Sequence, residues 1–348
     1  MELIVHSLNL ELKRPFRISH EVRTHQPSLI AELRDGEGRS GFGEAAMTRY
    51  YGLEAERCKR ELEGTRFLFA REAMLTPEAL HENLDWYLPE FHPFLRCALD
   101  VAVHDLWAKR HGKRLGEMWE QPQRQTPTCY TIGMADSFEE LTQTIRANPW
   151  PIYKLKVGKY ADDMAAIRHV RSLTDAALYV DANTGWTAEQ TLNRLPELHD
   201  LGVQLLEQPL PVGARLPSPA AGHPRPRKNG KTVPLIADES CQTEADVEAC
   251  AEHFDGINIK IVKCGGLLPA RRMIARARQL GLLVMAGCMT ESSFGISAIA
   301  QLLPELDFAD MDGAMLLAND PALGVSFDPA TGLARYPNKA GTGAGWRV

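Results

Sequence analysis

The sequence lacks the features of a membrane-spanning, secreted or nucleic-acid-binding protein. Its longest apolar stretches, such as LGLLVMAGCM, are too short to cross a bilayer. The first residues, MELIVHSLNLEL, have neither the basic region nor the continuous apolar region of a secretory signal. The formal net charge is −6, so no basic field is available to hold nucleic acid or an anionic membrane. These features argue against a nucleic-acid or membrane partner and fit a soluble metabolic enzyme, among many other classes of protein.

Paired cysteines are also absent. The seven cysteines are odd in number, and none forms a CxxC pair. This argues against a disulfide framework or a zinc knuckle and for reduced thiols in a cytoplasmic protein. Apolar material is plentiful, because 44% of the 348 residues are hydrophobic, which is enough for more than one core. The length suggests two domains, and a homo-oligomer is left open.

The N-terminal part of the chain predicts strands followed by helices. LIVHSLNLEL and SLIAELRDGEGRSGFGEA alternate apolar and polar residues around a glycine-rich turn, as a small antiparallel sheet does. Residues 76–111 then predict helices, and CALDVAVHDLWAKRHG in particular carries apolar side chains at helical spacing and ends in glycine. This order is typical of a compact α+β domain.

From about residue 125 onward, strand-like runs recur with helical patterns between them. Their centres lie roughly 25 residues apart, the length of one strand, loop and helix. The runs are TPTCYTIGM, YKLKVG, ALYVDANTGW, VQLLEQP, PLIADES, GINIKIVKCGG, LLVMAGCM and FADMDGAM. Eight such units predict an α/β fold, a modified (β/α)₈ TIM-type barrel. An open doubly wound sheet is the alternative, but the even spacing favours closure.

One unit departs from this rhythm. Residues 211–234 have a proline every few positions, and proline blocks a regular helix interior. We expect a solvated, mobile loop here, and a basic lid over an anionic ligand is the alternative. The basic side chains of this segment are Arg225, Arg227, Lys228 and Lys231.

Charged residues stand at the carboxyl ends of the predicted strands, where a barrel builds its active site. Lys154 and Lys156 end the second strand and share the face that points into the barrel. Burying two ammonium groups side by side is costly without anionic partners. The next three strands end in acids, and the sixth carries a lysine: Asp181, Glu207, Asp238 and Lys260.

The three acids also suggest a metal site. Asp181, Glu207 and Asp238 offer hard oxygen ligands with no cysteine or histidine set nearby, which selects Mg²⁺ or a similar ion. One such acid alone is more often a salt-bridge partner. Three at matching strand ends favour a metal.

These motifs resemble the muconate-lactonizing subgroup of the enolase superfamily. The resemblance is carried by KxK, DAN, EQP, ADES and INIK, and it extends over nearly the whole chain, including GFGEA and AGTGAGW. It implies a capping α+β domain at residues 1–120 with a specificity loop near 16–28, a barrel at 121–320 and a tail at 321–348 that returns to the capping domain. It also implies one essential Mg²⁺.

By the same resemblance, Lys156 and Lys260 are acid/base groups on opposite faces of the substrate, serving the (R) and (S) centres respectively. A proton next to a carboxylate is weakly acidic because its loss makes a dianionic enediolate, whose charge Mg²⁺ offsets. Lys154 and the metal disfavour the charged form of Lys156, and Lys154 can donate to the enediolate oxygen. Two bases permit epimerisation, but elimination and cycloisomerisation stay open.

The eighth strand favours epimerisation of a dipeptide. Asp310 and Asp312 place two carboxylates on one face and resemble the DxD feature of dipeptide epimerases, which holds the substrate ammonium; a solvated loop is the alternative. The resemblance also places Thr131, Cys288 and Glu291 in the site. Acid-sugar dehydratases of the superfamily use a late histidine, and no histidine follows residue 254.

Substrate preference depends on the capping domain. Arg23 lies in SHEVRTHQPS, where related enzymes have a specificity loop, and it suits an acidic side chain such as glutamate. A surface arginine is the alternative, and His20 and His25 are weaker candidates. We expect a Mg²⁺-dependent dipeptide epimerase acting at the α-carbon of the C-terminal residue, with L-Ala-D/L-Glu as the first substrate to try. The alternatives are an o-succinylbenzoate synthase, an N-acylamino-acid racemase or a muconate cycloisomerase, whose substrates lack the ammonium, and a non-catalytic binding barrel.

Overall fold

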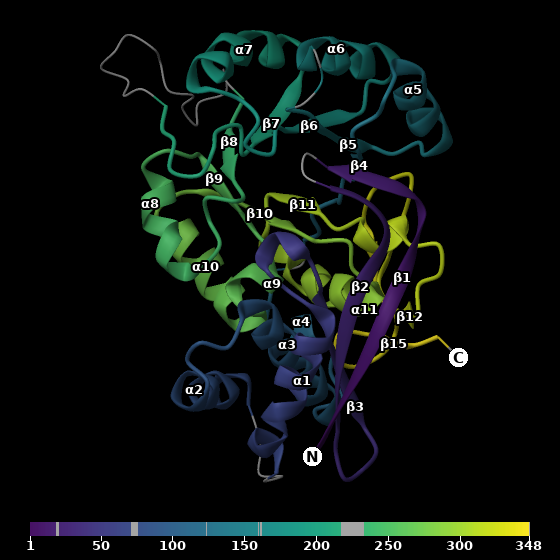
Figure 1. Cartoon of the computed structure of the whole chain (residues 1–348), viewed down its shortest axis with the longest axis vertical. Coiled ribbons are helices and arrows are strands. Elements are labelled where there is room, and N and C mark those ends of the chain that lie inside the picture. The colour runs from purple at the N-terminus through teal and green to yellow at the C-terminus, as the bar shows by residue number, and fades with distance from the viewer. Residues whose placement is uncertain are drawn as a thin grey trace.

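The computed structural model places an antiparallel sheet with helices below a parallel barrel (Figure 1). It describes residues 1–18, 21–70, 76–122, 124–158, 160, 162–216 and 233–347. Within these residues, no helix is both long enough and apolar enough to span a membrane. Most of residues 211–234, the segment expected to form a mobile loop, lies outside the described part.

The N-terminal sheet consists of β1 (Glu2–Ile18), β2 (Glu21–Arg34) and β3 (Ser40–Ala46) in that order. Helices α1 (Ala55–Gly64), α2 (Pro77–Tyr87), α3 (Pro93–Arg110) and α4 (Leu115–Met118) follow. The predicted order of strands and then helices is confirmed, although α1 was not anticipated.

Helix α3 packs directly on β3 because glycines leave room for it. A Cβ added at Gly43 would lie 2.1 Å from the carbonyl oxygen of Ala98, and one at Gly41 would lie 2.2 Å from that of Ala102. No side chain fits in such a space. The GFGEA motif therefore brings β3 and α3 into contact, which sets the position of Glu44, the residue after Gly43.

Eight parallel strands form the second sheet, each beside its neighbour in the chain. Its edges also meet, because the backbone N–H of Cys129, just before the first strand, donates to the carbonyl of Ala309 in the last at 3.0 Å. The predicted barrel is confirmed over the open sheet. Its strands are β4 (Tyr130–Ile132), β5 (Ile152–Lys156), β6 (Ala177–Asp181), β7 (Val203–Glu207), β8 (Leu235–Ala237), β9 (Gly256–Ile259), β10 (Leu283–Gly287) and β11 (Phe308–Asp310).

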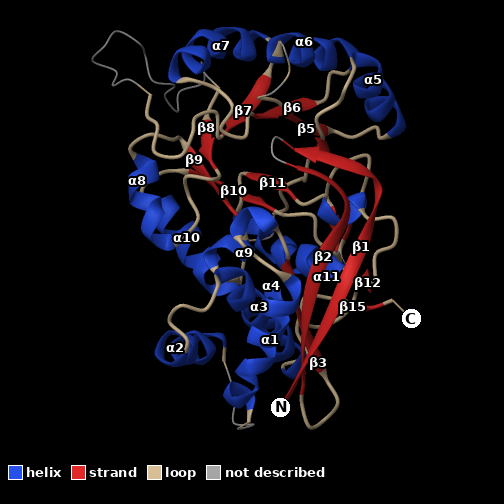
Figure 2. Ribbon diagram, viewed as in Figure 1, coloured by secondary structure: helices blue, strands red, loops and turns tan. Residues whose placement is uncertain are grey.

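Helices cover the outside of this barrel (Figure 2). The helices of this part of the chain are α5 (Phe138–Ala147), α6 (Asp163–Leu173), α7 (Ala188–Asp200), α8 (Val247–Ala251), α9 (Ile261–Cys264), α10 (Leu267–Gln279) and α11 (Ser293–Ile299). Short 3₁₀ turns occupy Arg49–Tyr51, Thr65–Phe69, Glu244–Asp246, Ala300–Glu305 and Gly313–Leu316.

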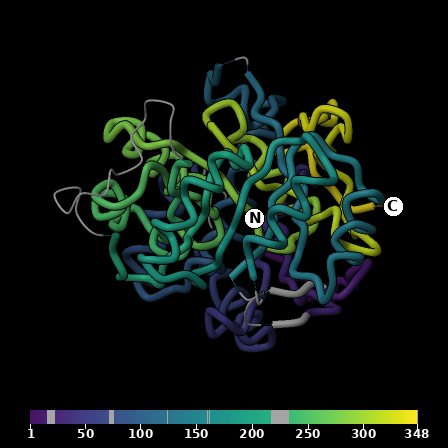
Figure 3. The backbone as a smooth tube through the Cα atoms, turned by 90° about the horizontal axis from the view of Figure 1, so that it is seen from above, coloured from purple at the N-terminus to yellow at the C-terminus, as the bar shows by residue number. Residues whose placement is uncertain are grey.

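The last residues run back along the N-terminal sheet. Small strand pairs join β12 (Ala322–Leu323) to β15 (Gly345–Trp346) and β13 (Ser326–Phe327) to β14 (Ala334–Arg335). The ring of Phe294 lies 4.9 Å from those of Phe42 and Trp346, so β3, α11 and the C-terminal segment share one apolar cluster. Seen from above, this segment and the stretch carrying α8 and α10 lie on opposite sides of the molecule (Figure 3).

Candidate active site

Strand register brings the predicted functional residues to one level of the barrel. Lys156 pairs with Asp181, and Asp181 pairs with Glu207, across three successive parallel strands. Asp238 and Lys260 directly follow β8 and β9. Because parallel strands end at the same edge, these side chains meet at the barrel mouth.

Lys154 lies beneath this level and is fully buried. Its Nζ lies 2.8 Å from Asp310 Oδ2, 2.7 Å from Glu207 Oε2 and 3.1 Å from Asp181 Oδ2. Burial alone would lower the pKa of Lys154, but Asp310, Glu207 and Asp181 raise it well above the ordinary value. The inward orientation predicted for Lys154 and Lys156 is confirmed, and the anionic partners that it required are present.

The other two lysines each contact one acid and stand across the mouth from each other. Lys156 Nζ lies 2.6 Å from Asp181 Oδ2, and Lys260 Nζ lies 3.1 Å from Asp238 Oδ2. Strands β6, β7 and β8 separate β5 from β9 in one direction, and β10, β11 and β4 separate them in the other. Both side chains line the same cavity, so a molecule bound there has one lysine on each side.

The three predicted acids form a buried cluster, of which Asp238 belongs to the described cavity lining. All three carboxylates are buried, and Glu207 Oε2 lies near Lys154 without the geometry of a hydrogen bond. Burial and then the charge of Asp181 raise the pKa of Glu207, whereas the nearby lysines outweigh burial and lower the pKa of Asp181 to about 2. The carboxylate oxygens are the hard donors that suit Mg²⁺, and in the structure each of the three acids contacts a lysine.

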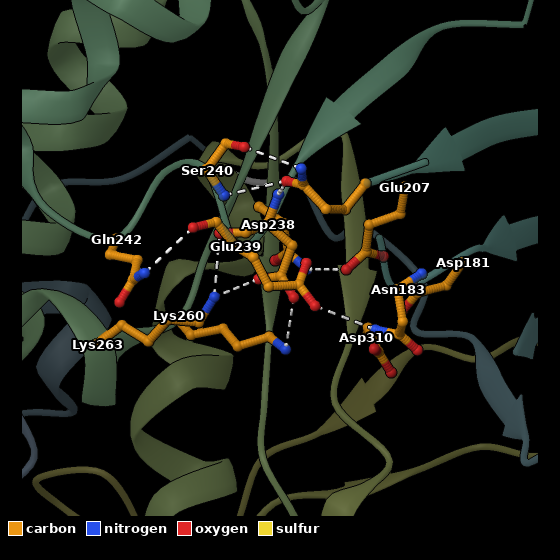
Figure 4. A network of polar contacts seen from close by, with 12 residues as sticks. Asp181, Asn183, Glu207, Asp238, Glu239, Ser240, Gln242, Lys260, Lys263 and Asp310 are labelled. Carbon is orange, nitrogen blue, oxygen red and sulfur yellow. Dashed lines mark hydrogen bonds and ion pairs between the residues drawn. The ribbon is translucent and has the colours of Figure 1, made fainter. Parts of the chain in front are cut away.

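Two residues that support the acids were missed in the sequence. Asn258 Nδ2 donates to Glu207 Oε1 at 2.8 Å. The Lys263 ammonium contacts Asp238 Oδ1 at 2.5 Å, and both side chains are labelled in Figure 4. Asn258 could have been found, because it stands two residues before Lys260 on the same face of β9. Lys263 lies on the one-turn helix α9, so the alternation of side chains along a strand could not predict that it points toward Asp238.

Thr131, Cys288, Asp310 and Asp312 come together at the other end of the cavity. The backbone N–H of Thr131 donates to Asp312 Oδ2 at 2.6 Å, and its hydroxyl lies 3.2 Å from Asp310 Oδ1. Burial and the charge of Asp310 raise the pKa of Asp312 to about 7. Asp310 differs because Lys154 outweighs burial and lowers its pKa. The pair is therefore a buried acidic end that favours a cationic ligand group.

The capping sheet contributes Arg23 to the cavity wall. Its guanidinium donates from Nη1 to Gln26 Oε1 at 2.8 Å. His25 is exposed and contacts Thr24, away from the cavity lining, and His20 lies outside the described residues.

Glu291 is placed differently from the other predicted site residues. It is fully buried and does not belong to the described cavity lining, and its Oε1 accepts the backbone N–H of Met289 at 2.8 Å. Burial and then the charge of Glu44 raise its pKa to about 8. The side chain thus lies behind the cavity wall, although the segment that carries it forms that wall.

Known proteins match this chain over most of its length. The family model described as enolase C-terminal domain-like matches residues 136–347. The chain belongs to the enolase superfamily. An L-Ala-D/L-amino acid epimerase from Flavobacterium johnsoniae is 45% identical over 99% of both chains.

More distant relatives of this superfamily member are also epimerases. An L-Ala-D/L-Glu epimerase from Escherichia coli K12 is 33% identical over 90% of this chain and 94% of its own. A solved dipeptide epimerase from Methylococcus capsulatus, in complex with Mg and L-Arg-D-Lys, superposes with a TM-score of 0.84 at 29% identity, covering 99% of this chain and 98% of that one.

Sequence reasoning missed several further residues that line the cavity of this enolase-superfamily site. They lie in loops and short 3₁₀ turns, where no periodic pattern indicates which way a side chain faces. They are Thr48, Tyr50, Tyr51, Asn183, Glu239, Met289, Thr290 and Leu316.

Proposed function

We propose that this protein is a Mg²⁺-dependent dipeptide epimerase that moves a proton at the α-carbon of the C-terminal residue. One observation carries the proposal: Lys156 and Lys260 enter a single cavity from opposite sides of the barrel. A base on each side is what inversion of a carbon centre needs, because the proton leaves on one face and returns on the other.

Asp181, Glu207 and Asp238 would hold the Mg²⁺. When bound, the ion supplies positive charge against the negative charge that develops on the substrate carboxylate. Lys154 and Asn258 keep Glu207 in place from below and beside it. We retain donation from Lys154 to the substrate carboxylate as a prediction, although Lys154 Nζ lies among three acids and does not belong to the described cavity lining.

The acidic end of the cavity would bind the α-ammonium of the dipeptide. Asp310 and Asp312 converge there with Cys288, and their ligand atoms all lie within 4.8 Å of one another. Thr131 orients both carboxylates through its N–H and hydroxyl. An o-succinylbenzoate, N-acyl amino acid or muconate has no ammonium to satisfy this end, which argues against the other activities of the subgroup.

Arg23 would recognise the side chain of the C-terminal residue. It lines the cavity from the capping domain, where a glutamate carboxylate can pair with its guanidinium. Two relatives are an L-Ala-D/L-amino acid epimerase and an L-Ala-D/L-Glu epimerase, which supports L-Ala-L-Glu as the first substrate to test. A cytoplasmic location is also part of the proposal, supported by seven cysteines that are all free thiols.

The proposal is tested by incubating the protein and Mg²⁺ with a dipeptide library in D₂O. A gain of one mass unit reports exchange of the α-proton whichever epimer is formed. Exchange confined to dipeptides with a free amino terminus is expected. Exchange of N-acyl amino acids in preference to dipeptides would point to the racemase alternative.

A further inference from the structure

A buried carboxylate of the capping domain contacts the barrel segment that forms one wall of the cavity. Glu44 on β3 is 1% exposed. Its Oε2 accepts the Ser292 hydroxyl at 2.5 Å, the Ser292 N–H at 3.0 Å and the Gly295 N–H at 3.1 Å. Its Oε1 accepts the hydroxyl of Ser28 at 2.6 Å from the neighbouring strand β2.

The segment from Cys288 to Ser292 connects this contact to the site. Cys288, Met289 and Thr290 line the cavity, and the segment continues directly into α11 at the residues that Glu44 holds. The wall also packs closely on the acidic end, because a Cβ added at Gly313, next to Asp312, would lie 2.3 Å from the Met289 carbonyl.

Glu291 gives this segment a second attachment on its buried side. Its carboxyl accepts the Met289 N–H, while its other oxygen has no hydrogen-bond partner. A Cβ added at Gly295 would lie 2.1 Å from that oxygen, so Glu291 is tightly enclosed against the first turn of α11. Among the described residues, four donors converge on Glu44, whereas one reaches Glu291. Burial raises the pKa of both carboxyl groups, and the hydrogen bonds from Ser28, Ser292 and Gly295 oppose this rise at Glu44.

We propose that Glu44 is a positioning residue that acts across the boundary between capping sheet and barrel. It fixes the wall segment, residues 288–292, against the end of the cavity formed by Asp310 and Asp312. Substrate binding there depends on a side chain that does not touch the substrate. The effect on binding rests on the proposed function, whereas the effect on the wall segment does not.

The test compares Glu44→Gln with a matched control, Asp105→Asn. Asp105 is equally buried and also accepts from four donors, but it ties Phe42 and Lys109 to Thr342, away from the cavity. Both variants lose a buried carboxylate, so both should unfold at a lower temperature. Only Glu44→Gln should also speed amide exchange at Cys288 and Met289, which Glu44 does not contact.

With L-Ala-L-Glu as substrate, Glu44→Gln should raise KM roughly tenfold and change kcat by less than about threefold. Ser28→Ala removes one donor to Glu44 without altering a barrel residue. It should raise KM and speed amide exchange at residues 288–289 by less than Glu44→Gln does. It replaces Glu44→Gln in the test if that variant does not fold. Unchanged exchange at residues 288–289 in these variants, or an equal rise in KM with Asp105→Asn, would overturn the proposal. If the wild-type protein is inactive on every dipeptide, the proposed function is wrong. The amide-exchange comparison then still tests whether Glu44 positions the wall segment.

Discussion

Lys154 lies at the centre of a buried charge network, with three carboxylates within 3.1 Å of its ammonium group. Such charges are costly to bury and stay in place only when each finds a partner. Removing one member of a buried pair typically costs about 3–5 kcal/mol. The network therefore explains why KxK occurs on this strand: Lys154 balances the acids, and Lys156 reaches the cavity.

The acid triad gives the first prediction. Asp181→Asn, Glu207→Gln and Asp238→Asn should each abolish Mg²⁺ binding and turnover, because each removes one negative charge from the proposed site. Isothermal titration with Mg²⁺ reports binding without substrate, and Asp105→Asn serves as a control that retains it. Near-normal activity after exhaustive chelation would contradict the proposed metal dependence.

The raised pKa of Asp312, about 7, gives a prediction on pH. Below this pKa the carboxyl is protonated and attracts an ammonium group weakly, and above it the carboxylate binds the ammonium. KM for a dipeptide should therefore fall as pH rises between about pH 6 and pH 8. Steady-state kinetics across that range measure the effect. Asp312→Asn should have a higher KM without this inflection, and an unchanged inflection in that variant would assign it to another group.

At the scale of elements, parallel strands explain how much of the site the sequence predicts. Strand alternation and a common carboxyl edge are enough to bring Lys156, Asp181 and Glu207 together. No such rule predicts which way a side chain in a loop points. Glu291 was therefore expected in the site, whereas it lies behind the cavity wall. Tyr51 was missed for the same reason, since the 3₁₀ turn that carries it reaches the barrel only through tertiary packing.

The contact between β3 and α3 gives a prediction on stability. Gly43→Ala should destabilise the protein by at least about 2 kcal/mol, because its Cβ would overlap the Ala98 carbonyl. Gly64→Ala is the matched control: it lies at the end of α1 with a helical φ of −63° and open space around it. Denaturant unfolding of both variants measures the difference, and equal stabilities would show that β3 and α3 can separate without cost.

At the scale of the whole molecule, the catalytic barrel is incomplete without the capping sheet. Barrel strands supply the lysines and acids, while Arg23, Thr48, Tyr50 and Tyr51 close the cavity from the N-terminal part of the chain. We propose that the capping sheet contributes to substrate preference and that the barrel supplies the chemistry. We keep the division at residues 1–120, 121–320 and 321–348 as a proposal.

The central claim is that two lysines act on opposite faces of one α-carbon. With the carboxylate held at the acid triad and the ammonium at Asp310 and Asp312, the α-carbon cannot turn over. Lys260→Ala should stop epimerisation in both directions, because the proton must cross both faces, yet leave Lys156 able to exchange the α-proton of one epimer. Lys156→Ala should show the mirror behaviour.

The decisive measurement is deuterium incorporation by NMR for both epimers of L-Ala-Glu with each lysine variant. The account predicts complementary exchange, with Lys156 serving the (R) centre and Lys260 the (S) centre. Epimerisation at the wild-type rate in either variant would contradict it.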